Sequence, residues 1–107
     1  MRNPQLVYQQ QSVKNASPLQ LVVKMYDLVI QATYREDEKK IRDILSTLIT
    51  GLNFDYEPAD QLFSLYRYCQ GLARKGEFSE IRDVLEPLRD TWQEAASQGN
   101  AAVTKQG

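Results

Sequence analysis

The chain has no histidine and only one cysteine, and both features limit the chemistry it can perform. Histidine is the most frequent acid–base group near neutral pH and a common metal ligand, so its absence removes the usual centre of both kinds of site. The single cysteine, Cys69, excludes an intrachain disulfide and is typical of a reducing compartment. The sequence also lacks nucleophile–base spacing, a glycine-rich phosphate loop and a cluster of metal ligands. We therefore expect no enzyme activity, no catalytic residues, no metal and no cofactor.

An excess of one charge and long hydrophobic runs are also missing. Lys and Arg number 13 against 14 Asp and Glu, which gives a net charge of −1. Nucleic-acid binding relies on concentrated positive charge, so we expect no nucleic-acid partner. The N-terminal MRNPQLVYQQQ has no apolar signal region, and the longest apolar stretch contains Lys24 and Asp27 and is too short to span a bilayer. These features predict a cytoplasmic protein without membrane insertion.

Apolar residues at three- and four-residue steps predict four helices, and no strand pattern competes with them. Pro18 suits the first position of a helix, Gly76 suits the left-handed position after one, and Pro87 should kink or split the last helix. Short connections favour an all-α, antiparallel up-down-up-down four-helix bundle, and no internal repeat is evident. The expected helices span 18–34, 37–52, 58–75 and 79–97, in a domain of residues 17–97 between an N-terminal arm (1–16) and a disordered tail (98–107).

Two of the predicted helices have more apolar surface than a bundle core needs. One apolar stripe per helix is enough to close a core, and the helices at 37–52 and 79–97 have essentially one each. Tyr26 and Trp92 lie on such main stripes and are interpreted as core residues. The helices at 18–34 and 58–75 also have a second stripe, formed by Leu21, Met25, Leu28 and Ala32 in the first and by Leu65, Tyr68 and Leu72 in the other.

The second stripes have two interpretations. They either broaden the core of the bundle, or they face outward as a groove for a partner helix with apolar anchors at helical spacing. Met25 is flexible and polarizable and Tyr68 is amphipathic, which suits a binding surface. A homodimer interface would use the same residues.

Four sequence stretches, taken in order, resemble a known family. They are YQQQSVKNASPLQLVVKMYD at 8–27, LSTLITGLNFD at 45–55, PADQLFSLYRYCQGLA at 58–73 and EIRDVLEPLRDTW at 80–92. In these motifs the chain resembles the flagellin export chaperones of the FliS type. It departs from their pattern in having Leu28 where a glycine is usual, and in being about four helical turns shorter between Asp27 and Asn53. We therefore expect a shortened paralogue in which the helices at 58–75 and 79–97 extend beyond their neighbours at that end.

The resemblance implies a cytoplasmic export chaperone that binds the disordered C-terminal segment of flagellin. Such a protein prevents premature polymerisation and delivers flagellin to the flagellar type III export apparatus. In the family, the N-terminal arm covers part of the binding surface until the client displaces it. The expected partner-binding residues are Leu6, Val7, Tyr8 and Val13 of the arm and Leu21, Met25, Leu28, Leu65, Tyr68 and Leu72 of the second stripes.

A different class of function is compatible with the same residues. The chain would then be an interaction or regulatory bundle of the flagellar system with another client, or a homodimeric structural module. A monomer that binds a flagellin C-terminal peptide would favour the chaperone, whereas a tight dimer that ignores the peptide would favour the alternative.

Overall fold

The computed structural model describes residues 18–106, with side chains as far as residue 98. The described residues form four helices and no strand, which confirms the predicted all-α class. The predicted arm at 1–16 and its residues Leu6, Val7, Tyr8 and Val13 lie outside the described residues. The helices are α2 (Pro18–Tyr34), α3 (Glu38–Thr50), α4 (Ala59–Arg74) and α5 (Phe78–Gln106).

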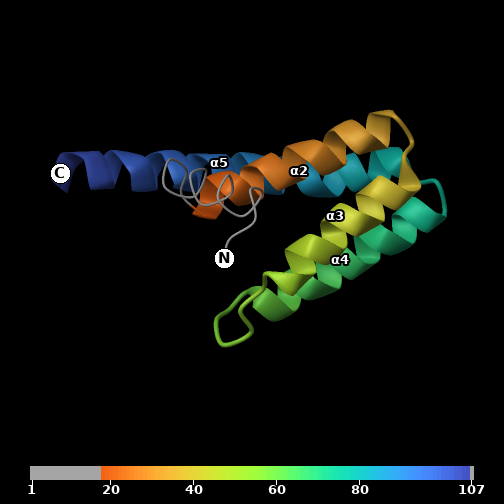
Figure 1. Ribbon diagram of the computed structural model, residues 1–107, viewed down its shortest axis with the longest axis horizontal. Helices are drawn as coiled ribbons and strands as arrows, with labels where there is room; N and C mark the ends of the chain where they lie inside the picture. The colour runs from red at the N-terminus through yellow and green to blue at the C-terminus, as the bar shows by residue number, and fades with distance from the viewer. Residues whose placement is uncertain (1–17, 107) are drawn as a thin grey trace, which may run out of the picture.

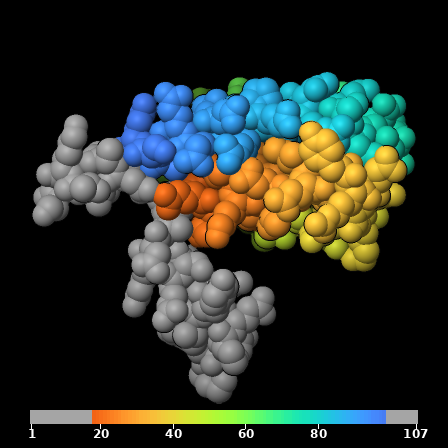
Figure 2. All heavy atoms as spheres, turned by 90° about the horizontal axis from the view of Figure 1, so that it is seen from above, coloured from red at the N-terminus to blue at the C-terminus, as the bar shows by residue number. Residues whose placement is uncertain are grey.

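Each helix packs against two neighbours, and together the four close into a bundle. The packed pairs are α2 with α3, α3 with α4, α4 with α5, and α5 with α2. Figures 1 and 2 both show α2 and α5 side by side, and Figure 1 shows both short turns at one end of the bundle. The connection between α3 and α4 lies at the opposite end, where the α2–α5 pair and the α3–α4 pair diverge (Figure 1). The predicted four-helix bundle is therefore confirmed, with one closed and one open end.

The helix ends follow the local signals in the sequence. Pro18 is the first residue of α2, and the Asp37 carboxylate caps α3 by accepting a hydrogen bond from the Lys40 backbone N–H at 3.1 Å. Gly76 follows α4 with a φ of 75°, the left-handed conformation that glycine adopts without a steric penalty. Local chemistry thus determines where these helices begin and end.

The predicted end of the last helix is wrong. Helix α5 continues from Phe78 to Gln106 without a break at Pro87, so most of the predicted tail at 98–107 is helical. Pro87 lacks the N–H that would bond to the Asp83 carbonyl, but both residues are exposed and water can satisfy that oxygen. An exposed proline is therefore accommodated here without splitting the helix.

The expected overhang beside the α2–α3 turn is also absent. Helix α4 (16 residues) is longer than its neighbour α3 (13), and α5 (29) is longer than its neighbour α2 (17), but this extra length does not lie beside the α2–α3 turn. Tyr34 and Glu36 of one turn line the same surface hollow as Gly76 and Glu77 of the other, which places the two turns at the same level. Both hairpins are therefore short at the closed end.

The two hairpins have the same turn geometry. The Asp37 N–H donates to the Ala32 carbonyl at 3.0 Å, and the Glu77 N–H donates to the Leu72 carbonyl at 2.9 Å. Glu36 has a φ of 56°, the only positive φ of a described non-glycine residue, and it occupies the place that Gly76 has in the second turn. Each residue of the first turn corresponds to the residue 40 positions later in the second turn. Tyr26 and Tyr66, whose hydroxyls form a hydrogen bond, are also 40 residues apart.

An internal repeat that the sequence analysis missed explains this match. With the offset of 40, Pro18 corresponds to Pro58, Tyr26 corresponds to Tyr66, and the triplet Ile-Arg-Asp at 41–43 recurs at 81–83. The repeat is weak as sequence because most other positions keep only their apolar or polar character. In the structure α2–α3 and α4–α5 are two similar helical hairpins with matching turns, and their equivalent tyrosines meet each other.

The two equivalent tyrosines meet in the centre of the core. Their hydroxyl oxygens are 2.7 Å apart, and their rings pack edge to face with centroids 6.1 Å apart. Tyr26 and Tyr66 are both buried, which confirms the core interpretation of Tyr26, whereas Trp92 is half-buried and packs against the edge of the same cluster. The core comprises Tyr26, Val29, Ala32, Ile41, Leu45, Leu48, Tyr66, Cys69, Leu72, Ala73, Ile81 and Leu85.

The buried hydroxyl pair and Cys69 predict a loss of stability at alkaline pH. Burial raises the pKa of Tyr26 and of Tyr66 above 10.0, and raises that of Cys69 from 9.0 to about 12. A group whose pKa is raised by folding stabilises the fold below its unfolded pKa, and this contribution is lost as the pH rises towards the folded pKa. The free energy of unfolding should therefore begin to fall above about pH 9, where Cys69 ionises in the unfolded chain, and should fall more steeply above about pH 10, where the two tyrosines also ionise there. Each group contributes a decline of about 1.4 kcal/mol per pH unit.

Urea unfolding at several pH values between about 7 and 11 measures this dependence. Cys69→Ala should move the onset of the decline to about pH 10, because only the tyrosine pair then remains. A free energy of unfolding that stays constant over this range would contradict the prediction.

Candidate partner-binding surface

The second stripe of α2 remains partly uncovered after the bundle has closed. Leu28 is 44% exposed, whereas Leu21 and Met25 are half-buried. Met25 packs against the core from the side, and Ala32, the last member of the stripe, is buried. The apolar surface that α2 offers to a partner is therefore centred on Leu28.

The second stripe of α4 divides in the same way. Tyr68 is 53% exposed and Leu65 is half-buried. Leu72 was also expected to contact a partner, but it is only 5% exposed and belongs to the core, next to the turn that leads into α5. Leu72 therefore stabilises the bundle and does not form part of an accessible surface.

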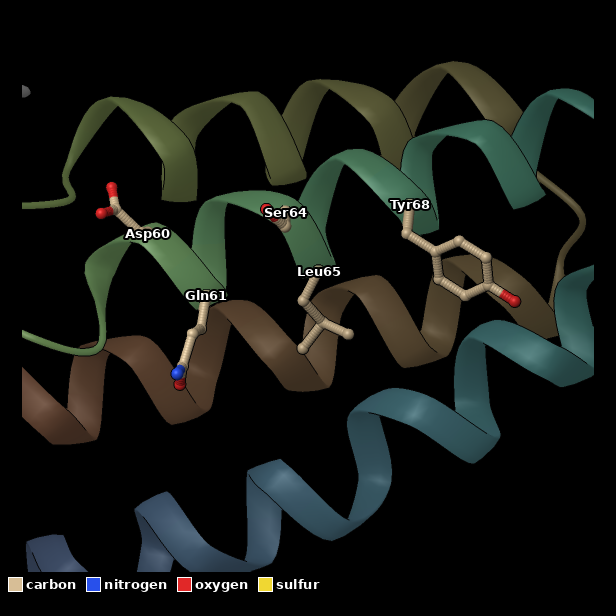
Figure 3. Close-up of a pocket in the computed structure, with 5 residues that line it drawn as sticks. All are labelled: Asp60, Gln61, Ser64, Leu65 and Tyr68. Carbon is tan, nitrogen blue, oxygen red and sulfur yellow. The ribbon is translucent and has the colours of Figure 1, made fainter.

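Tyr68 and Leu65 line an open groove of about 510 Å³ along α4. Figure 3 shows Gln61, Leu65 and Tyr68 on the side of α4 that faces α5. The offset of 40 relates Leu65 to Met25 and Tyr68 to Leu28, so the α4 groove and the exposed stripe of α2 are equivalent in the two hairpins. The molecule thus offers two similar apolar faces, both lying on the outside of a closed core.

A second hollow lies at the open end, between the two diverging helix pairs. Its volume is about 270 Å³, and all four helices contribute to its walls. The buried Nε1 of Trp92 has no hydrogen-bond partner of good geometry in the described part of the chain. The indole nevertheless lies close to the Tyr26 hydroxyl, where it partly offsets the rise that burial causes in the pKa of Tyr26. The cavity is lined by Leu19, Val22, Met25, Thr47, Leu48, Gly51, Leu52, Leu62, Tyr66 and Trp92.

An ion pair joins α2 to α5 at the edge of this region. Arg89 binds the Asp27 carboxylate with two hydrogen bonds, Nε to Oδ1 at 2.7 Å and Nη2 to Oδ2 at 3.3 Å, which raise the pKa of Arg89. Both side chains are about one-third exposed, so the pair fixes register more than it adds stability. Sequence reasoning missed this contact because only the folded bundle brings Asp27 and Arg89 together.

Sequence reasoning also missed three exposed aromatic residues near the start of α4. Phe54, Tyr56 and Phe63 are exposed, and the rings of Phe54 and Phe63 pack edge to face with centroids 5.9 Å apart. Two of the three lie in the connection between α3 and α4, where the sequence indicates only a turn. Their aromatic character within a polar connection is the signal that could have identified them.

The described residues contain no group of three or more side chains that could hold a metal ion. Among residues 18–106, none of the helices has the length and apolar character that a membrane span requires.

Comparison with known proteins gives one match. The model of a family described as flagellar protein FliS matches residues 32–99, which is more than half of the chain. The matched range contains three of the four motifs noted above and begins inside α2, after Tyr26 and Asp27. Searches of curated proteins and of solved structures gave no match.

Proposed function

Because the chain belongs to the FliS family of flagellar proteins, a family of chaperones and not of enzymes, we propose that it is an export chaperone for flagellin. It acts in the cytoplasm and binds the disordered C-terminal segment of flagellin. Binding keeps that segment from polymerising before export, and the complex is delivered to the flagellar type III export apparatus.

The uncovered apolar residues at equivalent positions of α2 and α4 carry this proposal. Leu28 and Tyr68 remain exposed although the core is complete without them, which supports a role in contacting another molecule. A disordered client with amphipathic segments cannot bury its apolar faces alone, and it folds when it meets such a surface. Burial of the order of 1,000–3,000 Å² accompanies this kind of binding, and the ordering of the client keeps the complex reversible.

The N-terminal arm regulates access to this surface. Its apolar residues Leu6, Val7, Tyr8 and Val13 precede α2, whose Leu19 lines the cavity at the open end. A tether this short gives the arm a high effective concentration at that end of the bundle. The arm thus competes with the client until the client displaces it.

Titration with a flagellin C-terminal peptide tests the proposal. Size-exclusion chromatography with light scattering should show a monomer that takes up the peptide. Deletion of residues 1–13 should increase the fluorescence of an apolar-surface dye and strengthen peptide binding. A tight dimer that ignores the peptide would refute the chaperone function, and unchanged dye fluorescence together with unchanged affinity after the deletion would refute the role of the arm.

A further inference from the structure

The two hairpins differ at the open end of the bundle. Two side-chain bonds join α2 to α5: Arg89 donates to Asp27, and Arg82 donates to Thr33. Because the later residue of α2 bonds to the earlier residue of α5, these bonds set the two helices in an antiparallel register. Continuing this register places residues 92–97 of α5 beside the first turns of α2, as Figures 1 and 2 also show. The start of α2 is therefore covered by the extension of α5.

The equivalent cover is missing on the start of α4. The Gln70 amide donates to the Arg42 carbonyl at 3.0 Å and to the Ser46 hydroxyl at 2.9 Å, which sets the register of α3 against α4. Continuing this register places Phe63 beyond Thr50, the residue at which α3 ends. Helix α3 therefore stops before it can cover Phe63 as α5 covers the start of α2.

The exposed fractions of two equivalent residues measure this difference. Val23 of α2 is 5% exposed, whereas Phe63, its counterpart in α4 with the offset of 40, is 39% exposed. The Phe54 and Phe63 rings pack edge to face, and Tyr56 is exposed in the same connection as Phe54. The start of α4 thus presents aromatic side chains where its counterpart presents a packed helix interface.

We propose that Phe54, Tyr56 and Phe63 form a docking site for one amphipathic helix of another protein. The helix lies antiparallel to the first turns of α4, in the position that residues 92–97 of α5 occupy against α2. The internal repeat is the reason for choosing a helix as the partner. The start of α2 is equivalent to the start of α4, and in this molecule a helix, α5, packs on it. Small side chains on the docking face fit this position, as Ala96 is buried in the corresponding stretch of α5.

The charges around the site define the partner further. Asp55 and Glu57 belong to the connection that contains Phe54 and Tyr56, and Asp60 lies about one turn before Phe63 on α4. None of these three carboxylates forms an ion pair with a described residue. A helix with basic residues along its flanks therefore complements the site, through contacts that favour association and orientation. The occupant is an amphipathic helix with a small apolar face and a positively charged rim.

This site is separate from the surface proposed for flagellin. Phe63 and Tyr68 are five positions apart on α4, which places them about 140° apart around the helix axis. Tyr68 lines the groove on the side that faces α5, whereas Phe63 contacts the connection that follows α3. The two surfaces can therefore be tested independently.

A synthetic helix based on the equivalent element tests the docking site in the full-length protein. The probe is a fluorescein-labelled peptide of residues 88–98 with Asp90→Lys and Glu94→Lys, stapled between the positions of Gln93 and Ser97. It should bind in fluorescence anisotropy, and Phe63→Glu should weaken binding by at least about tenfold, as removal of a central aromatic contact does. Tyr68→Glu is the matched control and should leave the affinity unchanged. Circular dichroism establishes that both variants are folded, since both replaced residues are exposed.

Three results would overturn the proposal. The first is the absence of saturable binding up to about 1 mM peptide, and the second is equal affinity for the wild type and Phe63→Glu. The third is a wild-type dimer that Phe63→Glu converts to a monomer, because the surface would then belong to a second copy of the chain. Failure of flagellin binding with retention of this peptide would refute the proposed function and leave the docking site intact.

Discussion

Replacing Tyr66 with alanine is expected to lower the free energy of unfolding by about 3–5 kcal/mol, the range for removing a large buried aromatic side chain. The ring is buried between the two hairpins, and its hydroxyl is the only described side-chain hydrogen-bond partner of Tyr26 that has good geometry. The substitution therefore opens a cavity and leaves a buried hydroxyl without a partner. For a domain of this size, such a loss is a large fraction of the total stability. Urea unfolding followed by circular dichroism measures it.

Tyr68→Ala is the matched control, because it removes the same side chain two residues further along the same helix. Tyr68 is exposed and belongs to no core cluster, so its replacement should change the free energy of unfolding by no more than about 0.5 kcal/mol. Equal losses for the two variants would contradict the central role assigned to the tyrosine pair.

A double-mutant cycle separates the hydroxyl contact from the packing of the rings. Tyr26→Phe and Tyr66→Phe each leave one buried hydroxyl unpaired, which costs about 1–3 kcal/mol. The double variant removes both hydroxyls, so no buried hydroxyl is left unpaired. Its loss in free energy of unfolding should therefore be smaller than the sum of the losses of the two single variants. Additive losses would mean that the two hydroxyls do not interact in solution.

The helices and their order could be predicted from the sequence because their signals are local. Pro18 begins α2, Asp37 caps α3 and Gly76 ends α4, and each acts through atoms within a few residues of its own position. The continuation of α5 through Pro87 could not be predicted, because it depends on whether the freed carbonyl of Asp83 faces water. Exposure of that kind is known only once the bundle has formed.

The candidate surface was predictable only in part, because helical periodicity gives an angle around the axis and not a level along the bundle. Leu72 and Tyr68 share a predicted stripe, yet Leu72 is buried at the closed end, where the chain returns into α5. Tyr68 lies further from that turn and stays exposed. The pairing of Asp27 with Arg89 likewise depends on the register between two helices far apart in sequence.

The internal repeat has a consequence for how a client would bind. Leu28 and Tyr68 occupy equivalent positions, so a client that uses both faces would contact them with two successive amphipathic segments. The two faces are not identical, since leucine offers only apolar contact whereas tyrosine adds a hydroxyl. Binding energy should therefore divide between two separate sites on one chaperone.

Leu28→Glu and Tyr68→Glu are each expected to weaken binding of the flagellin C-terminal segment by about tenfold, and the double variant by about a hundredfold. A carboxylate in either position must be desolvated when the client covers it, which opposes binding without affecting the folded chaperone. Isothermal titration calorimetry with the full-length variants measures the affinities. Phe63→Glu, which introduces the same charge on another side of α4, is the matched control and should bind the segment normally. If the double variant bound as tightly as the wild type, the client surface would have to lie elsewhere on the bundle.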